Sequence, residues 1–105
     1  MPMTREEILA SIKEKVLSIV PDAKVMLFGS RARGDWQEES DWDILVLTEQ
    51  EVTHELDDKV FDALYPIVLE IYNPINFILV NENDWLINPT YYSLSLGIKD
   101  EKMSI

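Results

Sequence analysis

Residues 24–46, KVMLFGSRARGDWQEESDWDILV, contain the pattern that decides the fold. Two short apolar runs, Lys24–Phe28 and Trp42–Thr48, flank a charged loop that begins with Gly29 and Ser30. Apolar runs of this length, bounded by glycine or polar residues, are typical of buried strands. The segment therefore predicts two strands joined by a polar loop.

The stretch before this segment predicts a long helix. Thr4 and Glu7 form a T-x-x-E capping box, in which each side chain satisfies a free backbone N–H of the first turn. The apolar residues that follow recur at helical spacing: Ile8, Leu9, Ile12, Val16, Ile19 and Val20. Pro21 is expected to end this helix.

A second long helix is predicted after the second strand. Thr48 and Glu51 repeat the capping-box pattern, and Val52, Leu56, Val60 and Leu64 follow at helical spacing. We expect Pro66 to end the helix, because proline has no backbone N–H and crowds the preceding turn. Residues 67–72 (IVLEIY) would then form a third strand, and residues 75–80 (INFILV) a fourth.

The composition supports a single folded domain, residues 1–105, and narrows its chemistry. The chain has 105 residues, of which 47% are hydrophobic, and its net charge is −11. That charge argues against a passive binder of nucleic acid or anionic membranes, both of which require a basic surface. Cysteine is absent, so disulfides, zinc–thiolate sites and thiol catalysis are excluded.

The chain shows no targeting or membrane segment. Its first residues, MPMTREEILASIKEK, carry charges where a signal peptide would need an apolar core. No apolar stretch approaches the roughly 20 residues that cross a bilayer. The expected location is the cytoplasm.

Two aspartates at the start of the second predicted strand form the main chemical feature. Side chains alternate along a strand, so Asp41 and Asp43 project from the same face. Two adjacent carboxylates repel each other unless a cation lies between them. Mg²⁺ prefers such hard oxygen ligands and is usually completed by substrate phosphates.

The turn before them offers groups that suit those phosphates. Gly29 and Ser30 would contribute backbone N–H groups and a hydroxyl. Residues 30–34 could open a short helix whose dipole favours an anion. Arg31 and Arg33 could neutralise the remaining phosphate charge.

Residues 28–34 (FGSRARG) followed by residues 40–46 (SDWDILV) resemble the signature of minimal nucleotidyltransferases. These belong to the DNA polymerase β-like nucleotidyltransferase superfamily. The resemblance implies an α+β fold, a two-layer polymerase β palm-like domain whose mixed sheet carries helices on one face. It also implies two Mg²⁺ ions and an NTP donor, for which we expect ATP.

The resemblance also assigns roles to residues of this chain. Gly29 and Ser30 would hold the β- and γ-phosphates, and Asp41 and Asp43 would coordinate metal. The site as a whole would hold its nucleotide with the glycine turn, the two arginines and the serine before the aspartates: Gly29, Ser30, Arg31, Arg33 and Ser40. The metals would align an attacking hydroxyl with the α-phosphorus.

The family's third carboxylate has two candidate positions here. Glu70 lies in the middle of the strand predicted after Pro66, which is where the third acid should be. A different alignment puts Asn76 in that place, and asparagine is neither an anionic ligand nor a general base. We favour Glu70, because Pro66 would end the helix early enough for residues 67–72 to be that strand.

Two functions of different classes follow. In the first, the protein is a Mg²⁺-dependent enzyme that moves an NMP group from an NTP to a hydroxyl of a protein, an RNA end or a small molecule. The resemblance suggests a separate helical partner of the HEPN type, in a toxin–antitoxin pair. In the second, the chain is a weakly active or inactive module that binds nucleotide and regulates a partner. The oligomeric state stays open.

Overall fold

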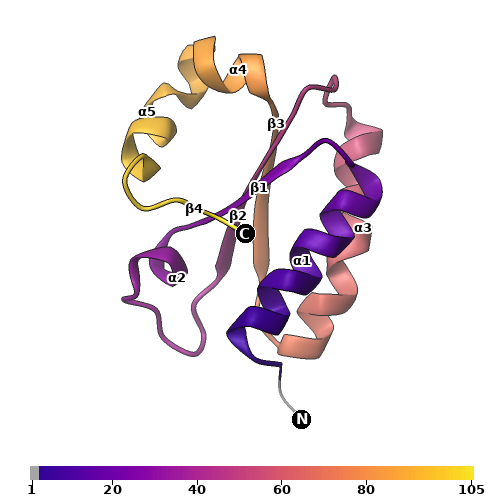
Figure 1. Cartoon of the computed structure of the whole chain (residues 1–105), viewed down its shortest axis with the longest axis vertical. Coiled ribbons are helices and arrows are strands. Elements are labelled where there is room, and N and C mark those ends of the chain that lie inside the picture. The colour runs from indigo at the N-terminus through magenta and orange to yellow at the C-terminus, as the bar shows by residue number, and fades with distance from the viewer. Residues whose placement is uncertain (1–2) are drawn as a thin grey trace.

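The computed structural model describes residues 3–105, which form a four-stranded mixed sheet with helices on its faces (Figure 1). The elements in chain order are α1 (Arg5–Ile19), β1 (Lys24–Phe28), α2 (Ser30–Arg33), β2 (Trp42–Thr48), α3 (His54–Ile71), β3 (Ile75–Asn81), α4 (Glu82–Ile87), α5 (Pro89–Ile98) and β4 (Met103–Ser104).

The strands lie in the order β3-β2-β1-β4. β1 is antiparallel to both β2 and β4, whereas β2 and β3 are parallel and joined by the long helix α3. The end of β1, the start of β2 and the start of β3 therefore meet at one edge of the sheet. The predicted mixed sheet and α+β class are confirmed.

Helices cover both faces of the sheet. The two long helices, α1 and α3, lie side by side on one face, and α4 and α5 lie on the other (Figure 1). The core on the α1/α3 face includes these fully buried side chains: Ile12, Val16, Val20, Leu27, Ile44, Val46 and Val60. A smaller core on the opposite face contains Leu45, Leu47, Val80, Trp85 and Ile98. The prediction that helices cover one face of the sheet therefore holds for α1 and α3, but it does not include α4 and α5, which cover the other face.

The capping box predicted at Thr4 and Glu7 is confirmed. The capping box predicted at Thr48 and Glu51 for the second long helix is wrong. Thr4 accepts from the backbone N–H of Glu7, and the Glu7 carboxylate accepts from that of Thr4. α3 is capped instead by Thr53, which accepts from Leu56 N–H. Thr48 is buried as the last residue of β2, because the apolar run of that strand extends through it.

The strand predicted over residues 67–72 is also wrong. α3 continues through Pro66 to Ile71 and ends at Tyr72, whose backbone is left-handed with φ 56°. Pro66 removes one intrahelical hydrogen bond, but the buried stripe of α3 continues beyond it with Ile67 and Ile71. Burial of that stripe against the sheet and α1 outweighs the lost bond.

Among residues 3–105, no helix combines the length and the apolar character that a membrane span requires.

Candidate active site

The strand register brings Asp43 and Asn76 side by side at the edge where β1 ends and β2 and β3 begin. Asp43 pairs with Phe28 of β1 on one side and with Asn76 of β3 on the other. The Asn76 amide donates to Asp41 Oδ2 at 2.8 Å and reaches Asp43 Oδ1 at 3.5 Å. Asp41 and Asp43 therefore share one face, as predicted.

The neighbours of Asp43 only partly compensate its charge at this edge. Burial raises the pKa of its carboxyl, the hydrogen bond from Asn76 lowers it, and the nearby charge of Asp41 raises it again. The net shift is upward, so the protein stabilises the Asp43 anion less well than water does. A cation bound between the two aspartates would remove that penalty.

Glu70 does not reach this edge. It lies on α3, and its expected position depended on a strand that the structure replaces with helix. Its side chain lines a hollow with Trp36, Trp42 and Glu38. Asn76 occupies the register position opposite Asp43. The alignment that puts Asn76 in the place of the third carboxylate therefore matches the fold.

The donor set fits a divalent cation such as Mg²⁺, with one limit. Asp41 and Asp43 supply two carboxylates, and the Asn76 amide, whose nitrogen faces them in this structure, can supply a neutral oxygen only if the amide group turns over. Within residues 3–105, no group of three or more His, Cys, Asp or Glu side chains is arranged to hold a metal ion. Substrate phosphates and water would have to complete the coordination.

Gly29 allows the turn after β1 to approach Asp43. Its φ is +77°, and a Cβ at this position would lie 2.3 Å from Asp43 Oδ2. No other residue fits there without displacing the aspartate. Ser30 begins α2 directly after this glycine, so the predicted short helix is confirmed.

Arg31 holds the loop together and turns away from the aspartates. Its guanidinium stacks on Trp36 and Trp42, with its carbon 4.6 and 4.4 Å from the ring centroids. It also donates to the carbonyls of Glu38 and Ser40 at 3.1 and 2.9 Å. Trp42 is buried and alternates with Asp41 and Asp43 along the chain, so its ring lies on the opposite face. Arg31 is therefore unavailable to a phosphate at the aspartate edge.

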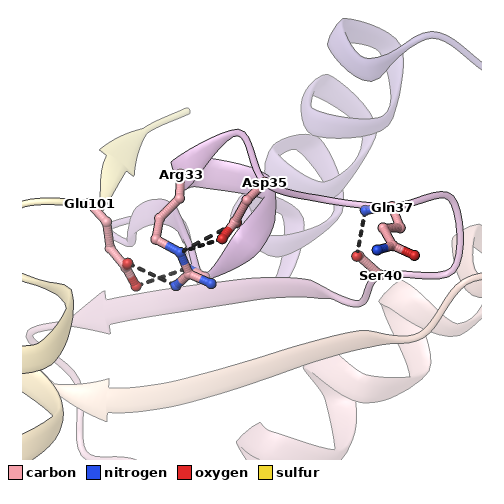
Figure 2. Close-up of polar contacts among 6 residues, drawn as sticks. Arg33, Asp35, Gln37, Ser40 and Glu101 are labelled. Atoms are coloured by element: carbon pink, nitrogen blue, oxygen red, sulfur yellow. Dashed lines mark hydrogen bonds and ion pairs between the residues drawn. The ribbon is translucent and has the colours of Figure 1, made fainter.

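Ser40 also stabilises the loop before β2. Its hydroxyl accepts from Gln37 N–H at 2.8 Å, which closes the loop before β2 (Figure 2). The loop between the motif halves is thus fastened at its end by Ser40 and at its centre by Arg31.

Arg33 is exposed and pairs with two carboxylates. Its guanidinium lies 3.0 Å from Glu101 and 3.4 Å from Asp35, and both contacts are drawn in Figure 2. The hydrogen bond to Glu101, followed by the charge of Asp35, raises the pKa of Arg33. Glu101 also accepts from Gly29 N–H at 3.1 Å. Sequence reasoning missed Glu101, because 72 positions separate it from Gly29 and no local motif marks it.

A known protein family matches most of this chain. The family model of the nucleotidyltransferase domain matches residues 9–88, which is more than half of the chain. The chain belongs to the nucleotidyltransferase family.

Two individual relatives are consistent with the family assignment. The chain is similar to a Methanocaldococcus jannaschii protein named "Putative protein adenylyltransferase", with 41% identity over 56 residues. That match covers 51% of this chain and 57% of the relative. A crystal structure described as a "putative nucleotidyltransferase" from Sulfolobus solfataricus superposes with a TM-score of 0.51 and 30% identity, over 91% of this chain and 75% of that one.

Proposed function

We propose that this nucleotidyltransferase moves an NMP group from an NTP, with ATP as the expected donor, to a hydroxyl in a Mg²⁺-dependent reaction. The observation that carries the proposal is the contact of the Gly29 turn with Asp43, at the edge where Asp41 also lies. A phosphate-binding turn and a pair of metal-binding carboxylates would then serve one nucleotide. The name of the Methanocaldococcus relative favours a protein hydroxyl as acceptor.

The roles divide between binding and support. Asp41 and Asp43 would hold Mg²⁺, and the Asn76 amide, turned over so that its oxygen faces the aspartates, would supply a neutral oxygen in place of a third carboxylate. Gly29 N–H, the Ser30 hydroxyl and Arg33 would hold the phosphates. The bound metal would supply charge neutralisation at the phosphates. Arg31 and Ser40 would keep the loop in shape.

The aspartate pair can be tested directly. The protein is incubated with labelled ATP, GTP, CTP or UTP, with Mg²⁺ and with a candidate acceptor, and label transfer is followed. We expect transfer that is lost in the double variant Asp41→Asn plus Asp43→Asn. Glu14→Gln plus Glu51→Gln is the matched control, because it removes two exposed carboxylates, one on α1 and one between β2 and α3. Transfer that survives in the first variant would refute the metal site.

Asn76 favours a second candidate function, in which the chain binds nucleotide and regulates a partner without transfer. The position opposite Asp43 lacks the anion that would complete a two-metal centre. The variant Asn76→Asp separates the two functions. If the protein is an enzyme of reduced activity, this variant should bind Mg²⁺ more tightly and transfer label faster. Nucleotide binding without transfer in both forms would support the regulatory module.

We further propose that a separate protein binds to α3, and that it is a helical partner of the HEPN type in a toxin–antitoxin pair. Phe61, Tyr65, Leu69 and Tyr72 are exposed and recur at helical spacing along α3. The Phe61 and Tyr65 rings stack with centroids 5.9 Å apart. These residues form an apolar stripe that the described chain leaves uncovered.

The charges beside this stripe favour a basic partner over a second copy. Asp58 and Asp62 are exposed on the same helix, Asp57 beside them is half-buried, and the whole chain carries a net charge of −11. Two such faces would repel each other. We expect the product of the neighbouring gene to co-purify with this protein, and Tyr65→Ser to weaken that association. Leu86→Ser is the control, because Leu86 is also a large exposed hydrophobic residue but lies on α4.

A further inference from the structure

The Glu101 carboxylate accepts hydrogen bonds from two donors that the phosphates of an NTP would need. One of its oxygens accepts from Gly29 N–H at 3.1 Å, and the other lies 3.0 Å from the Arg33 guanidinium. Figure 2 shows Glu101 reaching Arg33 from the C-terminal segment. A backbone N–H and a guanidinium together are typical ligands of a phosphate oxygen, and here a carboxylate takes that place.

The fold determines this position of Glu101. β4 pairs with β1 so that Met103 lies opposite Leu27 and Ser104 opposite Met26. The same antiparallel register, continued by two residues, places Glu101 opposite Gly29. Turn hydrogen bonds from Glu101 and Lys102 to the Ile98 carbonyl fix the segment between α5 and β4.

Glu101 contacts Gly29 and Arg33 although its carboxylate adds negative charge beside the aspartates. The charge of Glu101 is one of the causes that raise the pKa of Asp43. The side chain is only 15% exposed, so it is packed into the site and does not extend into solvent. Gly29 N–H and Arg33 therefore provide enough attraction to offset repulsion from Asp43.

We propose that Glu101 is an autoinhibitory residue that competes with the NTP phosphates for Gly29 N–H and Arg33. This inference rests on the proposed function, because it assumes that phosphates bind at this turn. A nucleotide must displace the carboxylate before its phosphates can reach these donors. Movement of the side chain alone would suffice, since β4 can remain paired with β1.

The test measures the affinity of the full chain for Mg²⁺–ATP and for inorganic tripolyphosphate by calorimetry. Tripolyphosphate has no base or sugar, so its affinity reports on the phosphate-binding groups alone. Glu101→Ala removes the competitor, and Glu101→Gln removes its charge while keeping its size. We expect both variants to bind both probes about three- to five-fold more tightly than the wild type, the effect of losing one partly exposed ion pair.

Asp100→Ala is the matched control. Asp100 is the neighbouring acid and is exposed, so its loss changes the net charge equally and should leave both affinities unchanged. Equal tightening in this control would overturn the proposal in favour of a general charge effect. Unchanged or weaker binding in both Glu101 variants, with the wild type binding normally, would overturn it while leaving the proposed function intact. Absence of binding in every form would refute both.

Discussion

Asp22 and Asp43 lie at opposite ends of the same sheet, and their carboxyl pKa values shift in opposite directions. Asp22 precedes β1 and accepts from the Thr48 hydroxyl at 2.9 Å, from Glu49 N–H at 2.7 Å and from the Gln50 amide at 3.0 Å. The backbone hydrogen bond from Glu49 is the largest cause that lowers its pKa. Asp43 has one amide contact at 3.5 Å, and burial raises its pKa.

The difference separates an aspartate that stabilises the fold from one that is available for chemistry. At the Asp22 end, the protein itself supplies the donors that the anion needs. At the Asp43 end, the Asn76 amide is shared between Asp43 and a second carboxylate, Asp41. Functional sites commonly contain groups whose charge the fold leaves unsatisfied until a ligand binds.

Replacing each aspartate with asparagine should lower a different property, label transfer for Asp43 and stability for Asp22. Asp43→Asn should lower label transfer by about 100-fold, the scale on which removal of a key electrostatic group acts. It should leave the free energy of unfolding unchanged or higher, because a half-buried charge is removed. Asp22→Asn should lower the free energy of unfolding by about 1–2 kcal/mol through its lost hydrogen bonds. Transfer per folded molecule should then be unchanged.

Urea unfolding and label transfer, measured on the same preparations, check this comparison. Asp62→Asn, an exposed change on α3, is the control for unfolding, and Glu14→Gln, an exposed change on α1, is the control for label transfer. The interpretation is wrong if Asp43→Asn unfolds the protein or if Asp22→Asn abolishes transfer in folded molecules.

The three glycines should rank by what surrounds them. Gly29→Ala meets Asp43 Oδ2 at 2.3 Å and also requires a φ of +77°, so it should cost about 2–3 kcal/mol of stability. Gly34→Ala has a φ of +92° but meets nothing within 4 Å, so about 1 kcal/mol is expected. Gly97 lies in α5 with open space around its Cβ position, so Ala should stabilise by about 0.5–1 kcal/mol.

Thermal or urea unfolding of the three alanine variants checks this order. Only Gly29→Ala is expected to reduce label transfer as well, because it alone moves Asp43. Equal losses at Gly29 and Gly34 would mean that backbone strain, and not the approach to Asp43, determines the role of Gly29.

The part of the site that was predictable from sequence is the part encoded locally. Gly29, Asp41 and Asp43 lie within the two strands and the turn that the apolar runs already define. Strand alternation alone places Asp41 and Asp43 on one face. The third position was not predictable in this way, because it depends on where α3 ends.

Pro66 shows why that end was missed. Its missing N–H is a local signal, whereas the continued stripe of Ile67 and Ile71 gains its stability from tertiary packing. Arg31 and Glu101 illustrate the same limit. The stacking of Arg31 on Trp42 depends on how the loop folds back, and the contact of Glu101 with Gly29 depends on the pairing of β4 with β1.

The smallest predicted effect is a pH dependence of stability that Asp22 contributes. The hydrogen bond from Glu49 N–H holds the pKa of Asp22 below the usual range of an aspartate in the folded protein, so its ionised form stabilises the fold. That contribution is fully present above the unfolded pKa and is lost as the pH falls through the folded pKa. The difference in free energy of unfolding between wild type and Asp22→Asn should therefore be constant from pH 7 to pH 5. It should shrink as the pH falls below about 4.

Urea unfolding of both proteins across this pH range measures that difference, with Asp62→Asn again as the control variant. A difference that stays constant down to pH 3 would mean that the Asp22 hydrogen bonds act through their geometry and not through its charge. In that case the contrast with Asp43 would rest on hydrogen-bond number alone. A difference that shrinks only in Asp22→Asn would tie the stability of this end of the sheet to an anion that the fold itself satisfies.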